Sequence, residues 1–461
     1  MILNTFLQQP RFKKNGGIHD VLIVAVPMLL SMSFDTLMTF VDRLFLSKLG
    51  PCEMNAALGG GGTQIVMINL FSGVISYVTA MVAQRMGAGK NGDCAKVFIQ
   101  SIYFALICMP LVFATIPVGY WMFGLQDLVP EQMEPQKLYF KILIFGSFLM
   151  LARNALANFF SGIGETKIIM QAAFAAMVVN VVANYFLIFG HGPFPQLGVA
   201  GAAYGTLLGT FVSVVMLACK YFQKTYRVRF ATSSTFGWDL PIMKELCRKG
   251  IPCGIEFFLN MLAFQCLLFL FHGLGAISAT AASVMFNWDM VAYVPLMGLE
   301  VASTSLVGRY VGAKDGAAAK RSTYSGLHIG WMYSIVIAVL FLLLPEVLVD
   351  IFSPDEASAI FSEARPMSLF MLRVAVFYIM AEVLLVIYAG ALRGAGDTFW
   401  VMVTSAIMNW FVTGSLYVAA YIFDLPAHYA WVWVVAGYTI WPFVFLARWK
   451  SGKWRRHVMD K

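Results

Sequence analysis

Six carboxylates stand inside long apolar stretches of this 461-residue chain, where acidic side chains are rare. In a membrane-spanning helix, each such acid costs at least about 2.5–3.5 kcal/mol on insertion scales, so its presence points to a function. A buried carboxylate can gain or lose a proton, and its oxygens can bind a hard cation such as Na⁺. The six candidates are Asp35, Asp42, Glu256, Asp289, Glu300 and Glu382.

Helical geometry places these acids at different depths. In a helix expected over 20–47, Asp42 lies roughly 33 Å along the axis, near the outer end. Asp35 precedes Asp42 by two turns, so one polar stripe can hold both, whereas the adjacent Arg43 faces another way. Asp42 alone could therefore be solvated at a helix end.

The other acids lie deeper. Glu256 is about nine residues, or roughly 14 Å, into a helix expected over 247–273, which is near the middle of a bilayer. The same estimate puts Asp289 and Glu382 near mid-depth. The roles of Asp289 and Glu300, like that of Asp35, rest on depth alone.

Asn180 and Asn184 form an i, i+4 pair on another apolar helix. Their amides can donate hydrogen bonds to a substrate or offer carbonyl oxygens to a cation. Hydrogen bonding between helices is an equally good interpretation, because amides often join helices in membranes.

The composition is that of a membrane protein: 60% of the residues are hydrophobic and only 12% are charged. Each span needs roughly 20 residues, so the chain can hold about a dozen helices with short loops. We therefore expect an all-α integral membrane protein with twelve transmembrane helices. The expected spans are 20–47, 58–85, 97–122, 137–161, 168–190, 198–222, 247–273, 279–308, 322–351, 367–392, 399–422 and 427–448.

Positive charge sets the expected orientation. Most of the 32 Lys and Arg residues fall in the termini and in the loops of one face, including the stretch KTYRVRFATSSTFGWDLP (224–241). This bias predicts a multi-pass protein of the plasma (inner) membrane with both termini cytoplasmic. The net charge of +8 is explained by topology, so no nucleic-acid partner is expected.

The two halves of the chain resemble each other. An offset of 225 residues lays VPMLLSMSFD (26–35) on IPCGIEFFLN (251–260), and Gly87-Ala88 on Gly312-Ala313. A slightly larger offset lays SGIGET (161–166) on RGAGDT (393–398). We infer two six-helix lobes related by a pseudo-two-fold axis along the membrane normal, because an even number of spans gives parallel repeats.

The expected organisation follows from this duplication. It comprises a cytoplasmic N-terminal segment (1–19), an N-lobe (20–222), a cytoplasmic linker (223–246), a C-lobe (247–448) and a basic cytoplasmic tail (449–461). Alternating access of two lobes is the usual task of such symmetry, and the alternative is that duplication only built a stable bundle.

Several motifs, in order along nearly the whole chain, resemble the multidrug and toxic compound extrusion (MATE) family. They are VDRLFLSKLG, VAQRMGAG (82–89), SGIGETK (161–167), NVVANYFLIFG followed by LGVAGAAYGT, GIPCGIEFFLN, LVGRYVGAKD (306–315) and GALRGAGDT (390–398). The resemblance implies an antiporter that exports small organic, often cationic compounds in exchange for Na⁺ or H⁺. It implies no other cofactor, and we expect a monomer in the lipid bilayer.

The resemblance also suggests site residues. Asp42 stands at the family's helix-one acid, and Glu256 and Glu382 stand at the helix-seven and helix-ten acids of the NorM-like branch. Asn180 and Asn184 resemble its helix-five amide pair. The DinF-like branch carries an aspartate where this chain has Asn184, so the chain looks closer to the NorM-like branch. Glu382 replaces a more usual aspartate.

Our hypothesis is that Glu256 and Glu382 hold the coupling cation, with Na⁺ possible there, while Asp42 and the amides tune the opposite lobe. Asp42 also stands with the coupling acids as a cation-binding candidate. A wider substrate or cation cavity is expected to include Asn180, Asn184, Asp35 and Asp289. Aromatic residues, 15% of the chain, and 27 Met residues could line it.

Two alternatives remain at this point. A flippase for a lipid-linked oligosaccharide or a related polyprenyl lipid would need cationic side chains for its pyrophosphate, and Arg153 and Arg373 could provide them. A membrane enzyme would need a nucleophile with a base, and the sequence shows no such constellation. Seven scattered cysteines lack metal-ligand spacing and are expected to be free thiols.

Overall fold

The computed structural model describes residues 15–125, 129–353 and 359–455, and this part of the chain is helical with no strand. Parts of the predicted termini 1–19 and 449–461, and of two predicted outer loops, lie outside the described residues. The chain divides into two compact units. The N unit is residues 23–258, and the C unit combines the residues up to Leu22 with those from Leu259 onward.

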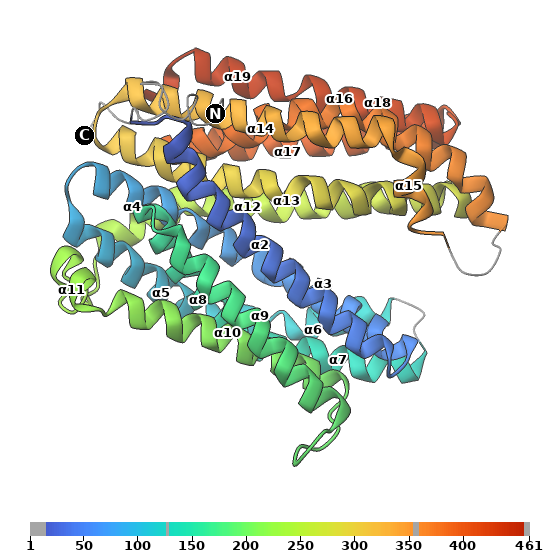
Figure 1. Cartoon of the computed structure of the whole chain (residues 1–461), viewed down its shortest axis with the longest axis horizontal. Coiled ribbons are helices and arrows are strands. Elements are labelled where there is room, and N and C mark those ends of the chain that lie inside the picture. Colours follow the sequence, from blue (N-terminus) through green and yellow to red (C-terminus); the bar gives the residue numbers. More distant parts are fainter. Residues whose placement is uncertain (1–14, 126–128, 354–358, 456–461) are drawn as a thin grey trace, which may run out of the picture. The chain divides into compact units, whose positions relative to one another are not determined.

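The N unit contains most of the first repeat (Figure 1). Its helices are α2 (Ile18–Ser47) from Ile23 onward, α3 (Pro51–Ser76), α4 (Val78–Gly87), α5 (Asn91–Phe113), α6 (Ile116–Gly124), α7 (Pro130–Phe145), α8 (Ser147–Ile163), α9 (Thr166–Phe189), α10 (Val199–Tyr221), α11 (Lys224–Phe230) and the first part of α12 (Leu240–Gly273).

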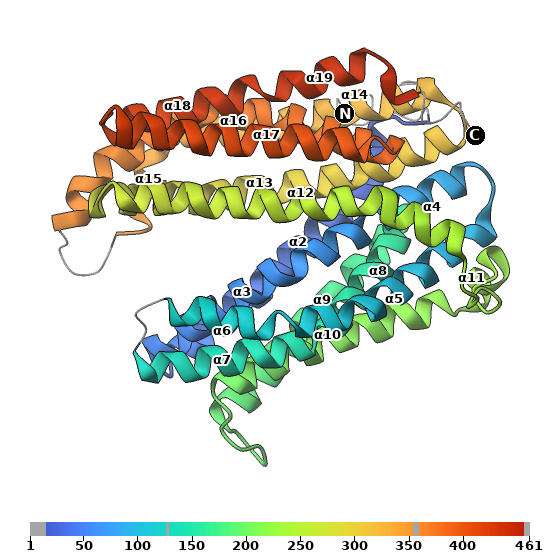
Figure 2. The same cartoon turned by 180° about the vertical axis from the view of Figure 1, so that it is seen from behind.

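The C unit contains most of the second repeat. After α12 its elements are α13 (Ala276–Gly312), α14 (Gly316–Leu343), α15 (Pro345–Asp350), α16 (Ala359–Ala395), α17 (Thr398–Tyr417), the π-helix η1 (Val418–Ile422), α18 (Ala427–Ile440), α19 (Pro442–Lys450) and η2 (Lys453–Arg455). Within this unit α16 packs against α13, α14, α18 and α19. Figure 2 shows these helices from behind.

Twelve spans are present if one bent pair is counted together. Within the described residues, eleven helices are long and apolar enough to cross a membrane, and α7 with α8 makes the twelfth through a bend of 48°. The bend lies at Gly146, where a Cβ would clash with Leu207 of α10. The all-α, twelve-helix fold class is therefore confirmed, although the predicted span 137–161 is broken rather than continuous.

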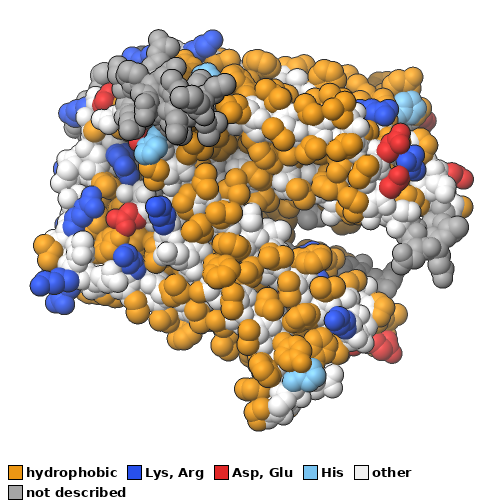
Figure 3. All heavy atoms as spheres, viewed as in Figure 1, with side chains coloured by type: hydrophobic (Ala, Val, Ile, Leu, Met, Phe, Trp, Pro, Cys, Tyr) orange, Lys and Arg blue, Asp and Glu red, His pale blue; other side chains and the backbone are white. Residues whose placement is uncertain are grey.

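The surface agrees with a membrane setting. Hydrophobic side chains cover most of the visible face of each unit in Figure 3, and many large apolar residues are exposed. A soluble protein rarely exposes so large an apolar area, whereas lipid-facing helices must. The chain is therefore a multi-pass membrane protein.

Small residues let helices approach closely in both units. In the N unit, Gly201 and Gly209 of α10 face the backbone of α9, where a Cβ would lie 2.5 Å from the Leu187 oxygen and 2.7 Å from the Ala176 oxygen. In the C unit, a Cβ on Gly394 of α16 would lie 2.6 Å from the Thr304 oxygen of α13. Close backbone contact of this kind drives helix association in lipid.

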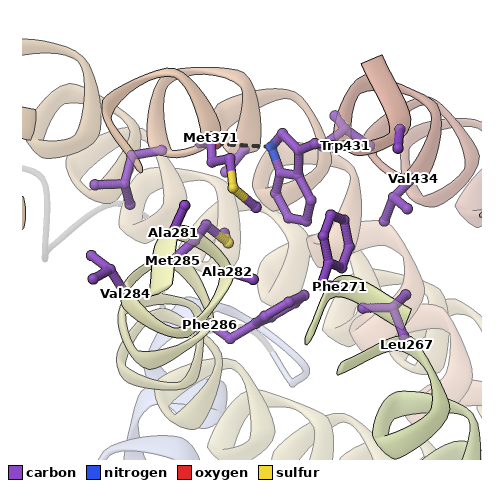
Figure 4. Close-up of a cluster of buried hydrophobic side chains, with 14 of the residues drawn as sticks. Leu267, Phe271, Ala281, Ala282, Val284, Met285, Phe286, Met371, Trp431 and Val434 are labelled. Atoms are coloured by element: carbon purple, nitrogen blue, oxygen red, sulfur yellow. Dashed lines mark hydrogen bonds between the residues drawn. The ribbon is translucent and has the colours of Figure 1, made fainter. Parts of the chain in front are cut away.

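The aromatic core of the C unit lies between α12, α13, α16 and α18 (Figure 4). Phe271 and Phe286 point toward Trp431, with ring centroids 5.9 and 5.7 Å from the indole. The Trp431 N–H donates to the Met371 carbonyl oxygen at 3.0 Å, which satisfies the indole's one donor inside the core.

The first helix of each repeat contributes to both units. The start of α2 belongs to the C unit, where Asp20 accepts a hydrogen bond from the Tyr310 hydroxyl at 3.0 Å. The first part of α12 belongs to the N unit, where Glu245 accepts from Arg85 at 2.7 Å and from Lys249 at 3.2 Å.

These two contacts are related by the internal repeat. The offset of 225 residues that aligns the halves also relates Asp20 to Glu245 and Tyr310 to Arg85. The compact units thus end at different residues from the predicted lobes 20–222 and 247–448, because both crossing helices are divided. That the two predicted lobes move relative to each other during transport stays a prediction.

Candidate functional sites

The N-unit site is built around Asp42 of α2, whose side chain is buried at 5% exposure. One carboxylate oxygen accepts a hydrogen bond from the Asn184 amide, and the other accepts from the Thr206 hydroxyl at 3.0 Å. The Asn184 amide also donates to the Asn180 oxygen at 3.3 Å. The structure therefore brings together Asp42, Asn180 and Asn184 as one polar cluster from α2, α9 and α10.

Local sequence explains how this cluster fits inside an apolar bundle. Gly205, one residue before Thr206, lies directly against the side-chain amide oxygen of Asn184, where any Cβ would clash. Asn180 and Asn184 are fully buried. The apolar wall beside them includes Leu46, Tyr139 and Ile188. A buried charge surrounded by neutral donors in a water-poor site can attract an organic cation strongly.

Asp35 does not join this cluster. Its carboxylate accepts from Arg153 of α8 at 2.8 and 2.9 Å, and Arg153 also donates to the Ser213 hydroxyl at 3.2 Å. The predicted common stripe of Asp35 and Asp42 is therefore divided between two sets of partners. Arg43 is exposed, as expected for a side chain that faces away from Asp42.

Glu256 is buried at 1% exposure on the part of α12 that belongs to the N unit. Close packing fixes this segment: a Cβ on Gly250 would lie 2.8 Å from the Val74 oxygen, and Gly254 lies against the Leu70 backbone of α3. Sequence reasoning placed Glu256 in the C-lobe, whereas its helix segment packs with the first repeat.

The C-unit site contains two acids on neighbouring helices. Asp289 of α13 accepts a hydrogen bond from the Tyr378 hydroxyl of α16. Glu382 follows Tyr378 by four residues and so lies on the same face of α16. Tyr378 thus connects the two acids: it donates to Asp289 and lies one turn from Glu382. Within the described residues, the buried Oε2 atom of Glu382 has no hydrogen-bond partner.

Neutral polar groups extend this site. The Tyr438 hydroxyl donates to the Asn409 oxygen at 3.0 Å, and the Asn409 amide donates to the Asn260 oxygen at 3.0 Å. Tyr378 and Tyr438 are adjacent, with ring centroids 6.3 Å apart. This chain of hydroxyls and amides connects α12, α16, α17 and α18 beside the two acids.

Glu300 has a structural partner instead. It forms an ion pair with Arg393, the arginine of the GALRGAGDT motif. The nearby hydroxyl of Thr304 donates to the Gly390 oxygen at 3.0 Å, which holds α13 against α16. Glu300 therefore belongs to the joint between these helices and is separate from the Asp289 and Glu382 pair.

Some residues of these sites were not singled out from the sequence. Thr206 ends the LGVAGAAYGT motif and could have been found as a polar residue within a run of small residues on an apolar helix. Tyr378, Tyr438 and Asn409 gave a weaker signal, because aromatic and amide residues on apolar helices usually only pack. Among the described residues, no group of three or more His, Cys, Asp or Glu could hold a metal.

Comparison with known proteins assigns the chain to a family. The MatE family profile matches residues 27–186 and 252–416, one segment in each repeat. "Multidrug resistance protein PmpM" from Pseudomonas aeruginosa is 27% identical over 400 residues, covering 85% of this chain and 82% of that protein. A "Probable multidrug resistance protein NorM" from Neisseria meningitidis is 28% identical over 426 residues, covering 90% of each chain.

Solved structures agree in fold. A crystal structure of MATE in complex with MaL6 superposes with a TM-score of 0.86 at 21% identity, covering 97% of this chain and 100% of the other. An outward-facing multidrug resistance MATE transporter of the MOP superfamily gives 0.85 at 22% identity, covering 97% and 99%. Because the family profile covers more than half of the chain, this protein belongs to the MatE family and is a NorM-like membrane transporter.

Proposed function

We propose that the protein is a secondary antiporter that exports small organic, often cationic compounds in exchange for Na⁺ or H⁺. The family supplies the transporter class, and its curated relatives carry multidrug resistance names. The observation that carries the proposal is the buried carboxylate oxygen of Glu382 that no described residue satisfies. An unsatisfied buried carboxylate is unfavourable, so binding a cation would stabilise it.

Each candidate acid has a proposed role. Glu256, on the part of α12 that belongs to the N unit, and Glu382, in the C unit, each bind or release the coupling cation. Asp42 with its amide partners attracts and orients the organic compound. Asp35, paired with Arg153, acts on the substrate path only indirectly. Cation binding favours one state of the transporter and the substrate favours the other, so differential affinity drives exchange. Both termini are proposed to be cytoplasmic, in a plasma membrane monomer.

Transport in reconstituted vesicles tests this function. We expect a fluorescent organic cation to move against its gradient when either a Na⁺ or an H⁺ gradient is imposed, and to stop when the gradient is dissipated. Glu256→Gln and Glu382→Gln should each lose gradient-driven export, because a neutral amide cannot exchange a cation. Glu346→Gln, on an exposed glutamate of α15, is the matched control. If Glu256→Gln and Glu382→Gln both export at the wild-type rate under either gradient, the mechanism is refuted.

Ligand binding by the purified protein tests the flippase alternative. Arg153, which could have met a pyrophosphate, is engaged by Asp35, and Arg373 is exposed. We therefore expect the purified protein to bind organic cations and not an anionic polyprenyl pyrophosphate. Tight binding of the anionic lipid alone would favour the flippase.

A further inference from the structure

A cavity at one end of the N unit lies between three membrane-spanning helices. It is lined by residues of α2, α9 and α10 and by the turn that precedes α9. The Thr166 hydroxyl donates to the Ile23 carbonyl oxygen at 3.3 Å, which holds α9 against α2 beside the cavity. The cavity measures about 230 Å³, whereas pockets for drug-sized ligands measure about 300–1,000 Å³. It therefore has room for a small polar group rather than for a whole organic drug.

The lining of this cavity carries two positive charges that no acid neutralises. Within the described residues, neither Lys167 nor Lys220 forms an ion pair. The Lys220 ammonium lies 5.5 Å from the centre of the Tyr226 ring of α11. Glu165, the acid of the lining, accepts a hydrogen bond from the Tyr226 hydroxyl instead of pairing with a lysine. Both ammonium groups are therefore available to an anion.

The second repeat uses the equivalent positions differently. The larger of the two offsets that align the repeats relates Glu165 to Asp397 and Lys167 to Phe399. Asp397 accepts from the Arg448 guanidinium at 2.8 and 3.3 Å, so its charge is paired inside the C unit. A lysine at this place is therefore not needed to join the helices of a repeat, and the two unpaired lysines are particular to the N unit.

Exposed apolar side chains lead away from the cavity along α2. Ile23 contributes to the lining, and Val26 and Leu30 follow it on the same exposed face of the helix. Farther along this face, the Phe34 ring lies 5.3 Å from the ring of Phe174, an exposed residue of α9. A basic cavity that continues into exposed apolar side chains matches a molecule with an anionic head and a hydrocarbon tail.

We propose that this cavity binds the phosphate headgroup of an anionic phospholipid. Lys167 and Lys220 provide the positive charge, the Gln171 amide provides a further hydrogen-bond donor, and the acyl chains lie along the exposed face of α2. The cavity is at the end of the N unit that carries the basic helix α11, where Figure 3 shows Lys and Arg side chains gathered. Basic pockets between spanning helices on the cytoplasmic side suit anionic headgroups.

The test is equilibrium lipid binding by the purified full chain in neutral detergent. The probes are fluorescent phosphatidylglycerol and phosphatidylcholine with the same acyl chains. The wild type should bind the anionic lipid about tenfold or more tightly than the zwitterionic one. Lys167→Gln combined with Lys220→Gln should remove this preference, and arginine at both positions should keep it. Lys224→Gln combined with Lys244→Gln is the matched control, because it removes equal charge from exposed lysines outside the cavity.

Inorganic phosphate distinguishes a lipid headgroup from a free anion. It should displace phosphatidylglycerol only at a much higher concentration, because it lacks acyl chains. Displacement at equal concentration would show a free-anion site and overturn the lipid assignment.

The proposal is also overturned if the wild type shows no preference for the anionic lipid, or if the control pair loses the preference as fully as the cavity pair. Should the cavity pair not fold, Lys167→Gln and Lys220→Gln are measured singly: a reduced preference supports the site, and an unchanged preference in both overturns it. No ion gradient enters this assay, so its failure leaves the antiport proposal to the transport experiment.

Discussion

Asp42 in the N unit and Glu382 in the C unit are both acids buried in the first or fourth long helix of a repeat, but their surroundings differ. Both oxygens of Asp42 accept hydrogen bonds from neutral donors, Asn184 and Thr206. Glu382 lies one turn from Tyr378, which donates to a second acid, Asp289, and it has an oxygen that no described residue satisfies. We propose that Asp42 keeps its charge for an organic cation, whereas the acids of the C unit take up a small cation.

Under the proposed antiport function, we infer that this difference divides the work between the repeats. A fixed negative charge suits an organic cation, which brings its own positive charge and apolar surface. A pair of acids suits a small coupling cation, which must be bound and released in each cycle. The duplicated fold thus carries two chemically distinct sites on related scaffolds.

The largest expected effect is on substrate binding by the N unit. Asp42→Asn removes the fixed charge but can keep both neighbours in hydrogen-bond reach. We expect the affinity for an organic cation to fall about tenfold or more, because its buried counter-charge is lost. Equilibrium binding of a fluorescent cation to purified protein measures this, and binding of a neutral analogue is the control. Equal loss for both ligands would mean that the cluster is only structural.

The second effect is on the packing that makes the N-unit site possible. Gly205→Ala puts a Cβ against the Asn184 oxygen, so α9 and α10 must separate or the amide must move. Overpacking of this kind costs about 1–3 kcal/mol. Thermal unfolding in detergent should show a lower Tm for Gly205→Ala. Gly414→Ala, where nothing lies within 4 Å, should leave Tm unchanged or raise it slightly.

The third effect compares the repeat-related contacts of the crossing helices. Tyr310→Phe removes one hydrogen bond to Asp20, and its expected cost is about 0.5–1.5 kcal/mol. Glu245→Gln removes a charge that both Arg85 and Lys249 contact, so it should cost more than Tyr310→Phe. Unfolding of each variant in denaturant gives the order. The reverse order would contradict the larger stabilisation expected from the charged contact.

The smallest effect concerns Asp35 and Arg153, which are partly exposed. A double-mutant cycle with Asp35→Asn and Arg153→Gln should give a coupling energy of about 0.2–1 kcal/mol, typical of exposed pairs. Organic-cation affinity should change little, because the pair is separate from Asp42. A large loss of affinity in Asp35→Asn would place Asp35 in the binding site after all.

Hydropathy and the internal repeat were sufficient to predict the twelve spans, because each lipid-crossing helix must be long and apolar. The bend at Gly146 was not predicted, because the sequence does not show that Leu207 of a distant helix packs against this glycine. The division of α2 and α12 between units was also missed. The packing of each part of these helices decides this division, and hydropathy carries no information about which neighbour a helix contacts.

The candidate acids were found in the same way, from the cost of burying charge. The partners of these acids were not predicted, because depth along a helix does not give the direction of a side chain. By their spacing, Asp35 and Asp42 share a helix face. Arg153 nevertheless pairs with Asp35, whereas Asn184 donates a hydrogen bond to Asp42. The partnership of Asp289 with Tyr378 and Glu382 required the contact of α13 with α16.

Cation binding by the purified protein tests the central difference between the repeats most directly. Uptake of protons and of radioactive Na⁺ is measured at equilibrium for the wild type, Asp42→Asn and Glu382→Gln. The account predicts that Asp42→Asn binds the coupling cation like the wild type, whereas Glu382→Gln loses it. Loss of the cation in Asp42→Asn with wild-type binding in Glu382→Gln would contradict the account.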